Sequence, residues 1–367
     1  MARSRTPVAA AIGATVLAAA ALATLKGADA ARRPWDAAAI AELALAQSLA
    51  AGNSDAAHEA EDRLRQRLTR TPLDAASRAI AANLMVESAD SNAARAAAVE
   101  QALAATRLVP TNEWIGGGTA RVLARCGRPD LALQETARIF AYAPDDGAAT
   151  LADIEPFAPP GRLEDGIPPA PDAWLAWSIR LRMNGREADA DDRLAKLLAR
   201  WPSNLDALRV AASAAASRGR IDELVRLVPP SLALPDTEST AALHAFRAWS
   251  KAVSGDAAGA RADAQSAVAL SNEDSWVLTL SGDAEAATDP ALAREFWNRA
   301  LYKLVAAEGT KDAARWLRSR LARLDEREGK AGDALRAWRA ILADHGDDVE
   351  ARQRIAALTG DDAAGLN

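Results

Sequence analysis

The sequence predicts an all-α fold, a solenoid of about eight antiparallel helix pairs. Three observations lead to this prediction. The 367 residues are 50% hydrophobic but only 4% aromatic, and abundant Ala, Leu, Arg and Glu favour helix over sheet. A small residue recurs at a fixed distance before helix-ending residues along most of the chain. Glycine ends several of the expected first helices, because it tolerates left-handed backbone angles.

The N-terminal segment 1–30 is predicted to be a signal peptide or a single membrane anchor. Arg3 and Arg5 precede an uncharged apolar run over 7–25, which has the length of a membrane span. The three residues ending at Ala30 have the small-x-small form of a signal-peptidase site. Cleavage and retention both stay open, and a soluble Ala-rich helix is a third alternative. Membrane contact is expected only through 7–25, if they are uncleaved.

Both export alternatives place the bulk of the chain in the periplasm, either free or anchored to the inner membrane. This expectation assumes a bacterial source, which the Ala- and Arg-rich composition indicates. No second spanning segment is expected in the rest of the chain.

The clearest repeat runs from Gly127 to Pro144. Gly127 ends a first helix, a second helix of about four turns follows, and Pro144 ends it because proline disfavours helix in the preceding residue. Six residues end a second helix in this way: Pro72, Pro110, Pro144, Pro202, Asn272 and Gly346. An alanine stands twelve residues before each of them: Ala60, Ala98, Ala132, Ala190, Ala260 and Ala334. Two degenerate units carry Leu224 and Ala293 at this position. The acidic or Asn residues after the terminators are expected to cap the next helices.

The repeat units are predicted to begin near Ala41, Ala79, Glu113, Pro171, Leu205, Ala241, Asp274 and Arg315. Most first helices carry a second small residue: Ser48, Ala120, Ser178, Ala212, Ala248, Ser281 and Ala322. Two antiparallel helices approach closely only where side chains are small. Each pair is therefore expected to cross at its two small residues.

Segment 145–170 interrupts the array and is predicted to be a Pro-rich linker or a packed loop. Because of its prolines, this segment cannot be helical over its whole length, and an extended course is expected. A third possibility is that it is a proline-rich docking ligand. It separates the predicted repeat blocks 36–144 and 171–358, the second of which ends in a capping helix. A frayed tail is expected at 359–367.

The Gly, Ala and Pro positions, together with Trp174 in Asp-Ala-Trp, resemble the tetratricopeptide repeat family over about residues 36–358. The resemblance implies a right-handed superhelix whose first helices line a concave groove. Carrying the groove positions of the family across gives these candidates: Trp114, Arg121, Arg125, Arg182, Trp249, Trp316, Arg323 and Arg327. Trp and Arg dominate binding hot spots, and Arg suits carboxylates. The alternative is that the tryptophans are core and the arginines a solvated face.

Catalytic chemistry has few candidate residues. Cys126 is the only cysteine and is expected to be a small buried residue rather than a reactive thiol. His58, His244 and His345 fall in different units without metal-ligand spacing. Glycines 116–118 follow no expected strand, so a close-packed or frayed helix start is favoured over a phosphate cradle. No enzyme activity, cofactor or metal is predicted.

Two functional hypotheses stay open. The first is a non-enzymatic adaptor that organises a protein complex on the periplasmic side of the envelope. The second is a component of polymer export that binds an acidic polysaccharide. Nucleic acid is not an expected partner, because the net charge is −6 and basic residues form no stripe.

Overall fold

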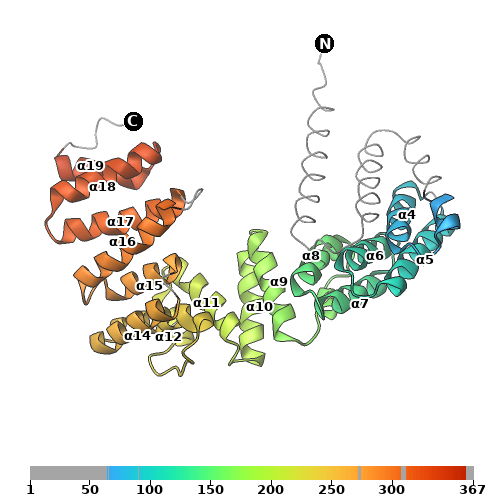
Figure 1. Ribbon diagram of the computed structural model, residues 1–367, viewed down its shortest axis with the longest axis horizontal. Coiled ribbons are helices and arrows are strands. Elements are labelled where there is room, and N and C mark those ends of the chain that lie inside the picture. The colour runs from blue at the N-terminus through green and yellow to red at the C-terminus, as the bar shows by residue number, and fades with distance from the viewer. Residues whose placement is uncertain (1–63, 65, 90, 272–273, 307–310, 361–367) are drawn as a thin grey trace, which may run out of the picture. The chain divides into compact units, whose positions relative to one another are not determined.

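The computed structural model describes residues 64, 66–89, 91–271, 274–306 and 311–360. These residues form α-helices, three short 3-10 helices and connecting turns, without a strand among them (Figure 1). The prediction of an all-α, tetratricopeptide-like repeat fold is confirmed. The predicted export segment 1–30, most of the unit that begins near Ala41 and the tail after Gly360 lie outside the described residues.

The chain divides into two compact units, Met1–Leu197 and Leu198–Asn367. Unit 1 contains α4 (Ala75–Ser88), α5 (Asn92–Leu108), α6 (Glu113–Arg125), α7 (Pro129–Phe140), α8 (Pro144–Ile154) and α9 (Pro171–Met183). The helix α10 (Glu187–Arg200) crosses the boundary. The pairs α4–α5 and α6–α7 are hairpins, and the first helices α4, α6 and α8 pack side by side.

Unit 2 contains α11 (Leu205–Ser217), α12 (Ile221–Leu227), α13 (Ala241–Val253), α14 (Ala257–Leu270), α15 (Ser275–Glu285), α16 (Pro290–Ala306), α17 (Lys311–Arg327), α18 (Ala331–Asp344) and α19 (Val349–Thr359). Consecutive members pair from α11–α12 to α17–α18, and α19 covers the last pair. The predicted unit starts agree closely with these helices. The largest differences are at Ala79 and Arg315, each four residues after the first residue of its helix.

The small residues lie where the paired helices cross. Every described member of the two predicted series is at most 1% exposed: Ala98, Ala120, Ala132, Ser178, Ala190, Ala212, Leu224, Ala248, Ala260, Ser281, Ala293, Ala322 and Ala334. Large side chains pack within the pairs as well: Trp297 of α16 lies against Gly282 of α15, and Trp338 of α18 donates a hydrogen bond to Glu326 of α17. The packing therefore follows the alanine register that the sequence shows.

The helix ends use the residues that the sequence predicts for them. Gly127 follows α6 with φ +73°, and Gly185, Gly219, Gly255 and Gly329 have the same left-handed conformation. Side chains of Asp74, Asn112, Asn204, Asp274 and Asp348 accept hydrogen bonds from the first backbone N–H groups of the following helices. These caps satisfy N–H groups that a helix start leaves free.

Three consecutive glycines let α6 touch three neighbours. A Cβ at Gly116 would lie 3.0 Å from Ile139 of α7, one at Gly117 would lie 3.1 Å from Thr150 of α8, and one at Gly118 would lie 3.4 Å from Asn83 of α4. Successive residues of a helix point about 100° apart, so each glycine faces a different helix. The expected close-packed helix start is what the structure shows.

The expected extended course of 145–170 is corrected in its first part, where Pro144–Ile154 forms helix α8. Proline at the first helical position loses no hydrogen bond, and Asp145 and Asp146 of the first turn favour a helix N-terminus. Ile154 is 1% exposed, as expected of a packed segment, whereas Phe157 is 45% exposed. The rest of the interval carries only two 3-10 turns.

The Pro-rich interval lies inside unit 1 rather than between the two units. The 3-10 turn Leu163–Gly166 packs against α7, in the layer of second helices. Arg186 pairs with Glu155 at 2.6 Å, and Lys196 pairs with Glu164 at 3.3 Å. These contacts join the interval to the turn between α9 and α10 and to α10 itself. The interval is therefore an incomplete helix pair: α8 is its first helix, and the prolines prevent a second helix from forming.

Candidate functional site

All eight predicted groove residues lie on first helices. Unit 1 holds Trp114, Arg121 and Arg125 on α6 and Arg182 on α9. Unit 2 holds Trp249 on α13 and Trp316, Arg323 and Arg327 on α17. The residues therefore form two sets, one in each unit.

The predicted arginines of unit 1 are engaged by carboxylates. Arg121 of α6 pairs with Asp153 of α8 at 2.8 Å, and Arg125 pairs with Glu87 of α4. Arg182 pairs with Asp191 of α10 at 2.7 Å. These pairs join neighbouring helices, and each half-exposed pair contributes at most about 1 kcal/mol to stability. These arginines therefore form ion pairs between helices and are not unoccupied anion-binding sites.

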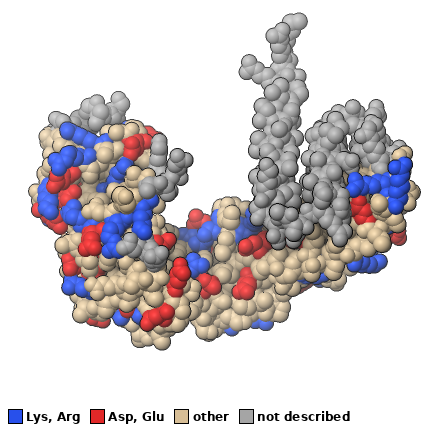
Figure 2. Space-filling model, in the orientation of Figure 1, with Lys and Arg blue, Asp and Glu red and all other residues tan. Residues whose placement is uncertain are grey.

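Arginines of unit 2 follow the same pattern. Arg323 of α17 pairs with Glu350 of α19 at 2.6 Å. Arg320, which the sequence did not single out, holds Asp283 of α15 through two hydrogen bonds of 2.5 and 2.9 Å. Arg327 is exposed, and no partner for it is found in the described part of the chain. In Figure 2 the region of α17–α19 accordingly carries basic and acidic atoms side by side.

Two tryptophans stack on each other, Trp276 at the start of α15 and Trp316 in the second turn of α17. The ring centroids of Trp276 and Trp316 are 6.2 Å apart, with 22° between the planes. The guanidinium carbon of Arg320 lies 3.2 Å from the centroid of Trp316. Trp316 also packs against the core of unit 2, while Trp276 stays 40% exposed. The result is an exposed indole supported by a column of Trp316, Arg320 and Asp283.

Trp249 contributes less surface than the groove assignment expects. It is half-buried and packs against two neighbouring parts of the core of unit 2. Its position therefore agrees in part with the alternative that the tryptophans are core between repeats. Trp114, by contrast, is 38% exposed on α6.

Among the described residues, sequence reasoning missed four large apolar side chains that are exposed on the first helices of the pairs. Ile179 and Met183 of α9 and Val253 of α13 stand one or five residues after the small residues Ser178 and Ala248. The predicted arginines Arg121, Arg125, Arg323 and Arg327 have the same spacing from Ala120 and Ala322. Trp276 is the second residue of α15, as Trp114 is of α6. The repeat register could have identified all four residues.

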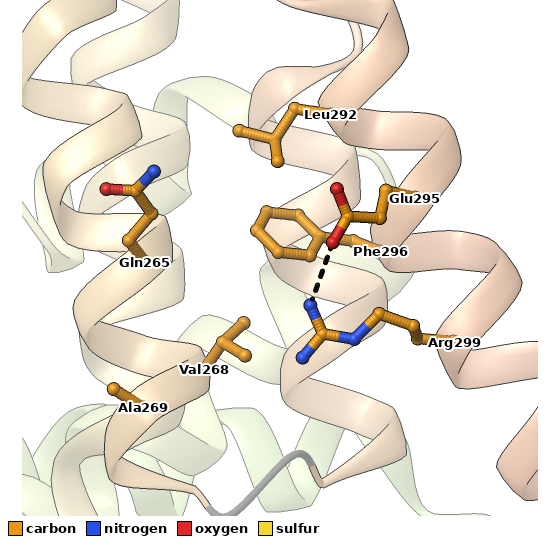
Figure 3. A pocket seen from close by; sticks show the side chains of 7 residues that line it. All are labelled: Gln265, Val268, Ala269, Leu292, Glu295, Phe296 and Arg299. Carbon is orange, nitrogen blue, oxygen red and sulfur yellow. Dashed lines mark hydrogen bonds and ion pairs between the residues drawn. The ribbon is translucent and has the colours of Figure 1, made fainter.

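A cleft of about 460 Å³ lies on the side of the second helices, between α14 and α16 (Figure 3). Val268, Leu292 and the buried ring of Phe296 line its base, and Gln265, Glu295 and Arg299 line its rim. Arg299 donates to Glu295 at 3.2 Å and lies 5.7 Å from the centroid of Phe296. The rim charges thus neutralise each other. The sequence did not predict this cleft.

Cys126 is half-buried after α6. Burial raises the pKa of its thiol, against the effect of Arg95. A raised pKa lowers the thiolate fraction and with it the reactivity.

No protein-family model and no curated protein sequence matches the chain. Several solved structures are similar. The C-terminal part of a TPR repeat-containing protein from Cytophaga hutchinsonii is 15% identical, covers 75% of this chain and 98% of that one, and has a TM-score of 0.34. A chain of the APC/C hetero-tetramer Cut9–Hcn1 is 11% identical over 89% of this chain and 63% of that one, with a TM-score of 0.42. Human IFIT1, a dimer with m7Gppp-AAAA, is 14% identical over 87% and 71%, with a TM-score of 0.32.

Proposed function

We propose that the protein is a non-enzymatic adaptor that binds a protein partner along the first-helix surface of unit 2. The main support for this proposal is that Trp276 is 40% exposed although its ring is stacked on Trp316. Exposed aromatic side chains that are already ordered bind at a small entropic cost. Val253 of α13, 55% exposed, adds apolar area on a neighbouring first helix.

Because most of these arginines are already in ion pairs, a protein segment is favoured over an acidic polymer as the ligand. Arg320 and Arg323 already hold Asp283 and Glu350. A polyanion would have to displace these carboxylates, and of the arginines on α17 only Arg327 is exposed without a partner in the described part of the chain. Binding of an acidic polysaccharide during envelope or exopolysaccharide export is therefore the second candidate.

The proposed location is the periplasmic side of a bacterial envelope, free or anchored to the inner membrane. Its support is the sequence of segment 1–30, with Arg3 and Arg5 before the apolar run 7–25. Among the helices that the structure describes, none is long and apolar enough to cross a membrane. In this location the adaptor would assemble envelope proteins.

The Trp276→Ala variant of the full chain tests the binding surface. Crosslinking in the source cells and mass spectrometry identify the partner, and its Kd is then measured with purified proteins. We expect Trp276→Ala to weaken binding by about tenfold or more, as loss of an aromatic hot spot does. The matched control is Tyr302→Ala, which removes an aromatic side chain that is 79% exposed on the second helix α16. This control is expected to bind as the wild type does.

Retention on an acidic polysaccharide gel separates the two candidates. Retention that Trp276→Ala leaves unchanged and that rising salt abolishes would support the polysaccharide candidate, since such binding depends on charge. If the Kd for the protein partner is the same for wild type and Trp276→Ala, the proposed surface is wrong.

A further inference from the structure

One face of α17 carries a row of large side chains, called the α17 row below. Its members, at spacings of four, three and four residues, are Trp316, Arg320, Arg323 and Arg327. In a helix these spacings keep the side chains within about 60° of one another, and the row covers about 16 Å along the helix axis. Trp316 supports the exposed indole of Trp276 at one end of the row. Arg327 is the other end.

The two middle members of the α17 row are engaged on opposite sides. Arg320 holds Asp283 of α15 through hydrogen bonds of 2.5 and 2.9 Å. Arg323 pairs with Glu350 of α19 at 2.6 Å. Each guanidinium is thus neutralised by a carboxylate of a neighbouring helix, so the middle of the row presents no net charge to a ligand.

Arg327 is exposed, and the described part of the chain provides no partner for it. The carboxylates beside it in sequence are held by other residues. Arg294 of α16 pairs with Asp325 at 2.7 Å and with Glu328 at 2.8 Å. Glu326 accepts a hydrogen bond of 2.6 Å from an indole N–H group of α18. Arg327 therefore keeps its positive charge at the end of the row.

The α17 row favours a helix over an extended segment as its ligand. A helix satisfies its own backbone N–H and C=O groups, whereas an extended segment needs donors and acceptors along the surface that it lies on. Arg320 and Arg323 already donate to carboxylates and are not available for this purpose. A ligand helix needs only an apolar side chain for Trp276 and a carboxylate for Arg327, which a guanidinium binds well.

We propose that the partner docks an amphipathic helix along α17. Its large apolar side chain contacts Trp276, and an Asp or Glu about eleven residues away, three helical turns, pairs with Arg327. This inference rests on the proposed adaptor function and names the chemistry of its partner. The apolar contact supplies most of the affinity. The charge contact fixes the register of the helix, because a basic residue at that place would face a like charge.

Selection of displayed peptides on the full chain tests this proposal. The probe is a phage library of helical peptides on an alanine–glutamine frame, about six turns long, with one face randomised. On the wild type we expect enrichment of peptides with a large apolar residue about three turns from an acid. Arg327→Glu should keep the apolar residue and replace the acid by Lys or Arg. The matched control, Arg339→Glu at an exposed arginine of the second helix α18, should select as the wild type does.

The Kd of one selected peptide completes the test. Replacing its acid by Lys should weaken binding to the wild type about tenfold or more and tighten binding to Arg327→Glu, because like and opposite charges exchange places. The proposal is wrong if no peptide is enriched, or if wild type and Arg327→Glu select the same residue at that position.

Trp276→Ala separates this inference from the proposed function. If Trp276→Ala weakens peptide binding but the charge exchange at Arg327 has no effect, the adaptor surface stands and the docking of a helix along α17 is wrong. If neither substitution changes the Kd, the adaptor surface and the docked helix are both wrong. Loss of binding in both variants, together with unchanged binding by Arg339→Glu, is the result that we expect.

Discussion

At the scale of single residues, charged side chains on the first helices serve mainly to connect helices. Arg121, Arg125 and Arg320 each reach a carboxylate on another first helix, and Arg323 reaches one on the capping helix α19. Exposed pairs of this kind contribute little individually. These pairs matter mainly for ligand binding, because the carboxylate partner already neutralises the charge of each guanidinium. The exposed indole of Trp276 is then the strongest remaining contact for a partner.

Glu285 is a residue whose charge should destabilise the fold. Its side chain is 0% exposed, Thr288 donates to one carboxylate oxygen at 3.0 Å, and the other oxygen has no hydrogen-bond partner among the described residues. Burial raises the pKa of Glu285 above the ordinary value, against the hydrogen bond from Thr288 and the charge of Arg261. The folded state thus binds this proton more tightly than the unfolded state. Stability falls as the pH rises from the unfolded pKa through the raised folded one.

We therefore expect Glu285→Gln to raise the free energy of unfolding by about 1 kcal/mol near neutral pH, because it removes an incompletely paired buried charge. Little gain is expected near pH 4, where the folded carboxyl is already protonated. Urea unfolding at both pH values measures the difference. Glu295→Gln, at an exposed glutamate of α16, serves as the control and should change stability by less than about 0.5 kcal/mol. A loss of stability at neutral pH would contradict the expectation.

At the scale of elements, the ends of the helices are specified locally. Gly329 follows α17 with φ +73° and has no atom within 4 Å of the site of a Cβ. Gly332 lies in the first turn of α18, also in open space but without a positive φ. The two glycines are three positions apart and differ mainly in backbone conformation.

Alanine at these two positions should have opposite effects. We expect Gly329→Ala to lower the free energy of unfolding by about 1 kcal/mol, because a Cβ is strained in the left-handed region. Gly332→Ala should raise it by up to about 1 kcal/mol, because alanine favours helix and loses less chain entropy on folding. Thermal unfolding of both variants measures this pair. If both substitutions change the free energy of unfolding in the same direction, the left-handed conformation at Gly329 does not determine the effect of adding a Cβ there.

At the scale of the whole molecule, one packing rule is used in both compact units. Small residues at the crossings of helix pairs are buried from Ala98 to Ala334. The boundary between the units falls at Leu197 and Leu198, whereas the Pro-rich interval lies within unit 1. A break in sequence regularity is therefore not a domain boundary here, because the interval keeps its contacts with α7, α9 and α10.

The proposed location gives a prediction for the whole chain. Alkaline phosphatase, which becomes active only outside the cytoplasm, is fused to the C-terminus. We expect the fusion to be active and deletion of 1–30 to abolish the activity, since the segment has the features of an export signal. N-terminal sequencing of the exported protein separates a start at Ala31, which means cleavage, from a start at Met1, which means an anchor. Activity that is independent of 1–30 would contradict the prediction.

The sequence by itself determined the helices, their ends and the pair crossings. Glycine at Gly127, caps such as Asn112 and alanines such as Ala132 act through local backbone conformation and side-chain size, which a repeat makes visible. Helix α8 was missed because seven prolines in its neighbourhood concealed that Pro144 stands at a first helical position.

Only the tertiary structure decided which charges are paired, which apolar side chains stay exposed, and what holds the segment 228–240 to α13. Arg323 and Arg327 look alike in sequence, yet Glu350 reaches only the first of them. The support of Trp276 by Trp316, Arg320 and Asp283 joins residues of two helices, and His244 of α13 bonds to Pro235 in the segment before that helix. Such contacts depend on distances between elements, which residue types and spacing do not specify.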